Sequence, residues 1–199
     1  GVAGGDMRGC GGGYADGGDA DGGGMCAGVA QKPGESGLAL GQRNRAVFKS
    51  IVEPGTASGF GGLFLVATNP VDVMTRITCQ LSGFAPQRVI GTGTALDTAR
   101  LRYLLGEYFD VAPRRIHAYV LGEHGDSSMV AMSQITFMGK PLAQLQQEKP
   151  QIFGKVTSDV LLERTHQLGM EIVIGKGSTE FGIGAALAMV CKAVLHDEK

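Results

Sequence analysis

Residues 63–78, LFLVATNPVDVMTRIT, decide the fold class of this chain. The stretch opens with a short, unbroken apolar run, residues 63–68, which is typical of a strand that is covered on both faces. Asn69 is a good N-cap, Pro70 suits the first helical position, and Asp72 favours the positive end of a helix. A buried strand that runs directly into a capped helix is the repeating unit of a parallel α/β sheet.

The same pattern recurs once downstream of this stretch, and a further helix is predicted upstream of it. Downstream, RVIGTG at 88–93 predicts a second strand, and the apolar periodicity that starts at Thr94 predicts a helix. Upstream, LGQRNRAVFKSIV at 40–52 predicts a helix, and EPGTASGFGG at 53–62 predicts a turn and connector.

The last third of the chain predicts a different arrangement. Residues 114–139 contain two strand-like segments that are broken by the turn GEHGD. Two helices are expected at about 156–175 and 178–196, with Gly177 near the end of the first and Ser178 as the N-cap of the second.

Composition narrows the class of protein. At 199 residues the chain is long enough for one large domain or two modest ones. A net charge of -1 gives no reason to expect nucleic acid or an anionic membrane as partner. No apolar run is long enough to span a membrane, and the amino end lacks the order of a secretory signal, so a cytoplasmic protein is expected.

Glycine and cysteine usage add two expectations. Glycine makes up 33 of the 199 residues and is concentrated in the first thirty, so poor order is expected for residues 1 to about 24. The four cysteines are scattered without the spacing of a metal site, and they are expected to be reduced, mostly buried thiols: Cys10, Cys26, Cys79 and Cys191. No metal site is predicted.

Three side chains form the first candidate site. His124 lies between glycines in GEHGDS at the end of an apolar strand, where it is either a turn residue or a catalyst that titrates near neutral pH. Asp97 and Arg100, in LDTAR, share one helical face. They are either a solvated ion pair, or an acid that orients an imidazole and a guanidinium that grips a carboxylate.

Together with the amide of Asn69, these groups suit a small hydroxy or keto acid. The imidazole takes the hydroxyl proton, the arginine anchors the carboxylate, and a hydride must leave to an acceptor. Because protein side chains do not accept hydride, a nicotinamide cofactor, NAD, is implied.

Four ordered motifs carry a resemblance to a known family. VATNPVDVMTRIT, GTGTALDTARLR, HAYVLGEHGDS and GKGSTEFGI resemble successive signatures of the L-lactate and malate dehydrogenase superfamily, and CAGVAQKPGES resembles its mobile active-site loop. The resemblance runs from about Tyr14 to the last residue. It implies an α/β fold, with part of a Rossmann-type parallel sheet followed by an α+β catalytic domain, truncated at both ends. Residues 1–92 are then a partial dinucleotide-binding domain, and 93–199 a partial catalytic domain. Gly22, Gly23 and Gly24 occupy the centre of a family strand in this alignment, so a weak strand is the alternative to poor order for this segment.

The resemblance also implies residue roles. His124 matches the proton donor and acceptor, Asp97 its carboxylate partner, and Arg100 the residue that clasps the substrate carboxylate. Asn69 and Thr179 match substrate-side positions. The positions that match cofactor contacts are Ala27, Gly28, Val66, Asn69, Thr92 and Ile183.

Gln31 favours the lactate branch of the family. A glutamine there leaves room for the methyl group of pyruvate, whereas malate enzymes typically place an arginine that pairs with a second carboxylate. The expected reaction is the interconversion of L-lactate and pyruvate, as in fermentative glycolysis. Malate or another 2-hydroxyacid remains an alternative substrate, and a catalytically silent fragment or subunit an alternative function.

The family pattern also predicts a regulatory site. Arg102 and His117 match positions that meet the phosphates of fructose 1,6-bisphosphate in bacterial members, so an allosteric homotetramer is expected.

The family's mobile loop ends with an arginine that polarises the substrate carbonyl, but this chain has Gly37 there. The GxGxxG turn and its preceding strand are also missing from the sequence.

Overall fold

A computed structural model describes residues 20–29, 32, 34–177 and 179–198 of the chain. The chain divides into two compact units, one formed by the residues up to Thr92 together with those from Leu187, the other by Gly93–Ala186. Each unit has a hydrophobic core of its own.

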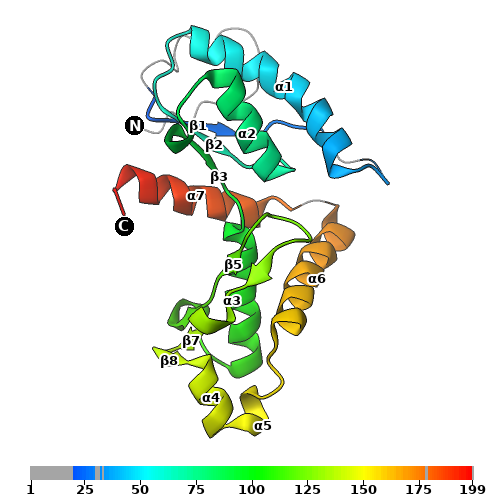
Figure 1. The fold of residues 1–199 in the computed structure, drawn as a ribbon, viewed down its shortest axis with the longest axis vertical. Coiled ribbons are helices and arrows are strands. Elements are labelled where there is room, and N and C mark those ends of the chain that lie inside the picture. Colours follow the sequence, from blue (N-terminus) through cyan, green and yellow to red (C-terminus); the bar gives the residue numbers. More distant parts are fainter. Residues whose placement is uncertain (1–19, 30–31, 33, 178, 199) are drawn as a thin grey trace. The chain divides into compact units, whose positions relative to one another are not determined.

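The first unit is built on a parallel sheet of three short strands in the order β1-β2-β3: Gly22–Met25, Leu63–Val66 and Val89–Gly91. Two helices, α1 (Gly37–Ala57) and α2 (Val71–Ser82), lie side by side in this unit (Figure 1). Their apolar faces join the strands in one core that includes Phe48, Val66 and Met74, each fully buried. This arrangement confirms the parallel α/β sheet that residues 63–78 predicted.

The second unit centres on helix α3 (Ala95–Phe109), along which α6 (Ser158–Lys176) packs (Figure 1). Its strands are short and antiparallel: β4 (Ile116–His117) with β7 (Thr136–Phe137), β7 with β8 (Lys140–Pro141), and β5 (Val120–Leu121) with β6 (Met129–Val130). Helices α4 (Leu142–Glu148) and α5 (Pro150–Phe153) follow β8, and α7 (Phe181–Leu195) follows α6. Leu101, Leu105, Ile116 and Ile135 are buried in the core of this unit.

The glycine-rich start differs in part from expectation. Gly22, Gly23 and Gly24 form β1, which pairs in register with Leu63, Phe64 and Leu65 of β2. The weak strand that the family resemblance allowed is therefore present, and the poor order expected from composition was wrong for these three. A strand is held by main-chain hydrogen bonds, and glycine supplies those as well as any residue does. Residues 1–19 lie outside the described part of the chain.

Helix α1 runs farther than its sequence predicted. It continues through Pro54 to Ala57, although residues 53–62 predicted a turn. The Thr56 hydroxyl donates to the Val52 carbonyl at 2.9 Å, and the Ser58 amide donates to the Pro54 carbonyl at 3.0 Å. These bonds satisfy the Val52 and Pro54 carbonyls of the last turn. Pro54 has no N–H and therefore makes no helical bond to the Ser50 carbonyl, yet the helix continues past it.

Two other local predictions were wrong. Asn69 is not the N-cap of α2, because Pro70 occupies that position and the peptide bond between them is cis. Cys26 is exposed, and Cys79 and Cys191 are half-buried, so the described thiols are not mostly buried. Gly177 caps α6 with a left-handed φ of 83°, as predicted, whereas Ser178 lies outside the described residues. Helices α4 and α5 had no counterpart among the predicted elements.

Candidate active site

Hydrogen bonds join the start of α3 to strand β5, which leads into the GEHGD turn. The Thr94 hydroxyl donates to the Val120 carbonyl at 2.6 Å, and the Val120 amide donates to Thr98 Oγ1 at 3.0 Å. Thr94 is the N-cap residue of α3, but its hydroxyl bonds to strand β5 instead of capping the helix. These bonds hold the start of the helix against the end of the strand.

The turn after β5 brings His124 to the start of α3. Gly122 and Gly125 flank it with φ angles of 93° and 155°, which L side chains rarely adopt. His124 Nδ1 lies 2.6 Å from Oδ2 of Asp97, whose residue is only 3% exposed. The imidazole itself keeps 27% of its side-chain surface exposed, so the pair has a buried acid and an accessible ring.

The Asp97 carboxyl is held in its ionised form. Burial raises its pKa, but the hydrogen bond from His124 and the positive charges of His124, Arg100 and His166 together lower it below the ordinary value. An ionised carboxylate only accepts hydrogen bonds, so Nδ1 of His124 carries the proton that bridges the pair. Nε2 is then the ring nitrogen that exchanges a proton with a substrate.

Arg100 lies one helical turn beyond Asp97, with its Nη1 atom 3.5 Å from Asp97 Oδ1. Its side chain is 16% exposed, and its buried Nε has no hydrogen-bond partner among the described residues. Gly169 of α6 packs on the guanidinium so closely that a Cβ added there would meet Nη1 at 2.9 Å. The guanidinium is thus fixed in place while part of its donor capacity is unused.

Sequence patterns missed a histidine that lies beside this group. His166 on α6 has its Nε2 3.2 Å from the Ser128 hydroxyl, and Ser128 is 5% exposed. A half-buried helical histidine has no motif of its own, so only the packing of α6 could place it here.

The first unit holds three of the predicted cofactor-side residues at one edge of its sheet. Because the three strands are parallel neighbours, Ala27, Asn69 and Thr92 all follow carboxyl ends of strands, where α/β sheets bind nucleotides. The Thr92 amide donates to the Val66 carbonyl at 2.9 Å, and the Thr68 hydroxyl donates to the Ala27 carbonyl at 2.7 Å. Asn69 is exposed and Thr92 is buried.

Asn44 of α1 is a second residue that the sequence did not single out. It is 1% exposed, its Oδ1 accepts from the Val29 amide at 2.8 Å, and its Nδ2 donates to the Asn69 carbonyl at 2.8 Å. Gly28 lies against it, and a Cβ there would come within 2.6 Å of Thr68 Cγ2. Asn44 therefore ties together the main chain after β1 and after β2.

The remaining predicted residues differ in their exposure. Thr179 and Ile183 are half-buried, and Val66 is fully buried in the first core. Gln31 lies outside the described residues. Gly37 is exposed at the first position of α1, and nothing in the described structure lies within 4 Å of a Cβ added to it.

The two predicted effector residues lie close together in the second unit. Arg102 Nε donates to the Ala118 carbonyl at 3.0 Å, and its guanidinium carbon lies 4.9 Å from the Tyr119 ring centroid. His117, which precedes Ala118, is exposed on β4.

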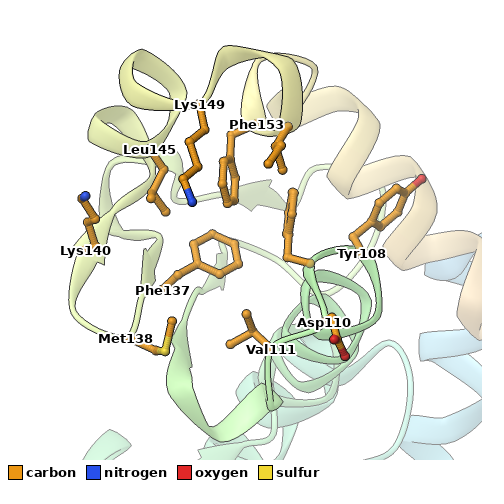
Figure 2. A pocket seen from close by; sticks show the side chains of 11 residues that line it. Tyr108, Asp110, Val111, Phe137, Met138, Lys140, Leu145, Lys149 and Phe153 are labelled. Atoms are coloured by element: carbon orange, nitrogen blue, oxygen red, sulfur yellow. The ribbon is translucent and has the colours of Figure 1, made fainter.

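A hollow of about 670 Å³ lies at the other end of α3 from the His124–Asp97 pair (Figure 2). Tyr108 on its wall follows Asp97 by eleven positions, which is roughly 17 Å along a helix. Its floor is the aromatic core, where the rings of Phe109 and Phe153 stack with centroids 4.4 Å apart. Asp110, Lys140 and Lys149 also line it, but none of the candidate catalytic residues does, so the hollow is separate from the catalytic candidates.

Two absences concern the described residues only. Among them, no group of three or more histidine, cysteine or acidic side chains could hold a metal ion. Within the same part of the chain, no helix is long and apolar enough to cross a membrane.

A parallel α/β unit and a buried Asp–His pair beside an arginine define a class of protein that fits the dehydrogenases of small hydroxy acids. Comparison with known families makes this specific. Residues 5–91 match the lactate/malate dehydrogenase NAD binding domain, and residues 94–199 match the alpha/beta C-terminal domain of the same family. The chain belongs to the lactate/malate dehydrogenase family.

Individual relatives agree with the family match. The L-lactate dehydrogenase of Bacillus caldolyticus is 49% identical over 174 residues, which are 87% of this chain and 55% of that protein. The L-lactate dehydrogenase of Corynebacterium glutamicum (strain R) is 45% identical over the same shares. The chain therefore spans about half the length of the curated relatives it matches.

Solved structures give the same result. MGS-M5, a lactate dehydrogenase enzyme from a Medee basin deep-sea metagenome library, superposes with a TM-score of 0.85 at 40% identity, covering 93% of this chain and 59% of that one. The minor L-lactate dehydrogenase from Enterococcus mundtii, in its ligands-bound form, gives a TM-score of 0.83 at 40% identity, covering 92% and 58%.

Proposed function

We propose that this chain carries the acid–base and substrate-binding part of an NAD-dependent L-lactate dehydrogenase. The observation that carries the proposal is the 2.6 Å contact between His124 Nδ1 and the buried, ionised Asp97. This contact fixes the tautomer of the imidazole and leaves Nε2 as the proton-exchanging atom. An acid–base group with a pKa near neutrality suits the removal and return of a hydroxyl proton.

In the proposed reaction, Nε2 of His124 gives its proton to the carbonyl oxygen of pyruvate and takes it back from the hydroxyl of L-lactate. Asp97 orients the ring and stabilises the imidazolium that exists between turnovers. Burial of Asp97 strengthens this effect, because the charge is screened less by solvent.

Arg100 is proposed to bind the substrate carboxylate. A guanidinium presents a planar fork that matches a carboxylate in two parallel hydrogen bonds. The contact with Asp97 and the packing of Gly169 fix its plane before substrate arrives. Such preorganisation places the reacting carbonyl without a further loss of side-chain entropy. Thr179, which is half-buried, is proposed to contact the same substrate.

NAD is the proposed cofactor, and it supplies or accepts the hydride at the substrate carbon. The residues of the first unit fit one end of such a ligand, since Ala27, Gly28, Asn69 and Thr92 gather at the carboxyl edge of a parallel sheet. Val66 supports this edge from within the hydrophobic core, and Ile183 is proposed as an apolar wall for the nicotinamide. The sequence contains no GxGxxG turn for the pyrophosphate, so these residues account for only part of a dinucleotide site.

Pyruvate is favoured over oxaloacetate because position 31 is glutamine. A neutral amide has no charge to pair with a second carboxylate, and burial of that carboxylate without a partner is costly. Gly37 supports a second candidate, a slow or silent enzyme, because no cation stands where the family pattern has an arginine.

The test is the oxidation of NADH by the intact chain with pyruvate or oxaloacetate, compared with His124→Asn. Loss of the acid–base group is expected to lower kcat by roughly 10²–10⁴, whereas His196→Asn, a change at an exposed histidine, leaves it unchanged. Faster turnover of oxaloacetate contradicts the lactate assignment. Absence of turnover together with no saturable change in NADH fluorescence supports the silent alternative.

We further propose a cytoplasmic homotetramer that responds to fructose 1,6-bisphosphate. The free thiols Cys26, Cys79 and Cys191 suit a reducing compartment. A shared phosphate site is supported by the bond from Arg102 to the main chain of Ala118, the residue after His117. The bisphosphate is expected to lower the apparent KM for pyruvate in wild type and in Arg76→Gln, but not in Arg102→Gln. Unchanged saturation curves in an active wild-type protein rule the effector out.

A further inference from the structure

His166 is a titratable group beside the His124–Asp97 pair that the proposed mechanism leaves unused. It lies on α6, and its Nε2 shares a hydrogen bond of 3.2 Å with the hydroxyl of Ser128. Ser128 is 5% exposed and His166 is half-buried, so this bond is largely shielded from water on the Ser128 side. A shielded bond between two polar side chains specifies one arrangement of the segments it joins.

The bond joins α6 to the turn that carries His124. Ser128 follows His124 by four positions, and its amide donates to the Gly125 carbonyl at 3.2 Å, which closes the turn. The upstream end of the turn is held by the bonds between Val120 and the first residues of α3. Between these two anchors lie Gly122 and Gly125, which contribute no side chains to packing, so the position of His124 depends on both anchors.

His166 also acts on the acid of the pair. Its positive charge is one of those that lower the pKa of Asp97 against the effect of burial, after His124 and Arg100. The charged groups that act on Asp97 are therefore Arg100 of α3, His124 of the turn and His166 of α6. The turn also carries the exposed acids Glu123 and Asp126. One α6 side chain thus contacts the segment that carries the imidazole and acts on the carboxylate that orients it.

We propose that His166 is a positioning residue for the His124–Asp97 pair, fixing the downstream end of the His124 turn through Ser128 and adding a second imidazole to the electrostatic surroundings of Asp97. The role in turnover rests on the proposed function, because it requires His124 to be the acid–base group. The effect on the geometry of the pair does not, and it is measurable without any substrate.

The substrate-free experiment uses NMR on the intact chain, whose four histidines keep the spectrum simple. A ring proton held between His124 Nδ1 and a carboxylate resonates far downfield, so it reports the pair directly. His166→Ala and Ser128→Ala each remove the anchor and are expected to shift or broaden this resonance. His166→Gln can still hydrogen-bond Ser128, so it is expected to keep the resonance.

His166→Gln also isolates the electrostatic part. Removing one positive charge from the surroundings of Asp97 is expected to raise the titration midpoint of that carboxyl, followed by carboxyl carbon NMR between about pH 2 and 6. His196→Gln is the control, since it removes a histidine that is exposed on the other unit, and neither signal is expected to move.

Steady-state kinetics give the second readout. Loss of one side-chain hydrogen bond that positions the imidazole is expected to lower kcat roughly three- to tenfold in His166→Ala and Ser128→Ala. KM for pyruvate is expected to stay within about twofold, because the carboxylate contact of Arg100 is retained. His166→Gln is expected to recover most of the lost kcat.

A purely structural role gives a different outcome. If Ser128→Ala and His166→Gln melt at lower temperatures but leave the ring-proton resonance, the Asp97 titration and kcat at their wild-type values, the proposal is wrong. Should His166→Ala fail to fold, those two variants decide the matter. If the wild-type chain turns over no pyruvate, the proposed function fails, and the NMR arm decides the positioning role by itself.

Discussion

Replacing Asp97 with asparagine is the sharpest test of the candidate site. The substitution keeps the shape of the side chain and removes its charge at the 2.6 Å contact with His124. Asparagine can still accept a hydrogen bond from Nδ1, so the contact becomes neutral without becoming a cavity. What changes is the stabilisation of the protonated imidazole.

The size of the effect follows from the burial and the geometry of the pair. A hydrogen bond to a charged group contributes about 1.5–3 kcal/mol, and a neutral one about 0.5–1.5 kcal/mol. Because Asp97 is 3% exposed, water does not replace the lost charge. The difference, about 1–2 kcal/mol, corresponds to a fall of roughly one unit in the pH at which His124 titrates, at 1.36 kcal/mol per unit.

The assay is NMR titration of the histidine ring protons in wild type and Asp97→Asn. Asp126→Asn is the matched control, since it makes the same change of charge on an exposed residue of the same turn. His124 is expected to titrate about one unit lower in Asp97→Asn only. If Asp97→Asn leaves the midpoint where it was, or if Asp126→Asn moves it equally, the pair does not hold the imidazole as argued.

Three further predictions concern stability and turnover. Gly37→Arg has open space for its side chain and is expected to raise pyruvate turnover by roughly 10²–10³. The control Gly37→Ala only improves the helix start and is not expected to raise turnover. Equal rates for both variants contradict the loop assignment. In Gly169→Ala the added methyl group presses on the Arg100 guanidinium, so KM for pyruvate is expected to rise several-fold. Gly175→Ala on the same helix is the control, because its added methyl group has no neighbour within 4 Å. A similar KM in both variants contradicts the role of Arg100 in substrate binding. The pKa of Asp97 is lower in the folded state, so its contribution to the free energy of unfolding is present above its unfolded pKa of about 3.9 and is lost as the pH falls through the folded value. Acid unfolding curves of Asp97→Asn are therefore expected to be flatter than wild type below about pH 4, and identical slopes count against an ionised pair.

Local sequence patterns predicted much of the fold. The apolar run at 63–68 and the helix after Pro70 predicted the strand–helix unit, because burial on both faces and helix-start preferences are properties of a few neighbouring residues. Local patterns failed where distant partners decided the outcome. Gly22, Gly23 and Gly24 form a strand because β2 supplies hydrogen-bond partners, and α1 continues past Pro54, which local helix preferences disfavour.

The candidate site divides in the same way. His124, Asp97 and Arg100 were identified from the sequence, since glycine neighbours and an i, i+3 spacing are local signals. Asn44 and His166 were missed, because a buried polar residue within a helix looks like any other polar residue until its partners are known. Both act through bonds that span many positions of the chain, between Asn44 and Asn69 and between His166 and Ser128.

By itself, the sequence determined the class of sheet, the family, and the residue types that can carry acid–base chemistry and grip a carboxylate. Only the tertiary structure decided which nitrogen of His124 carries the bridging proton, which side chains fix the Arg100 guanidinium, and which residues hold the turn and the strand ends in place. The physical reason is the distance along the chain over which each kind of interaction acts. Helix starts, strand burial and turn chemistry act over a few residues, whereas hydrogen-bond partners, burial and electrostatic neighbours are set by segments that meet only when the chain has folded.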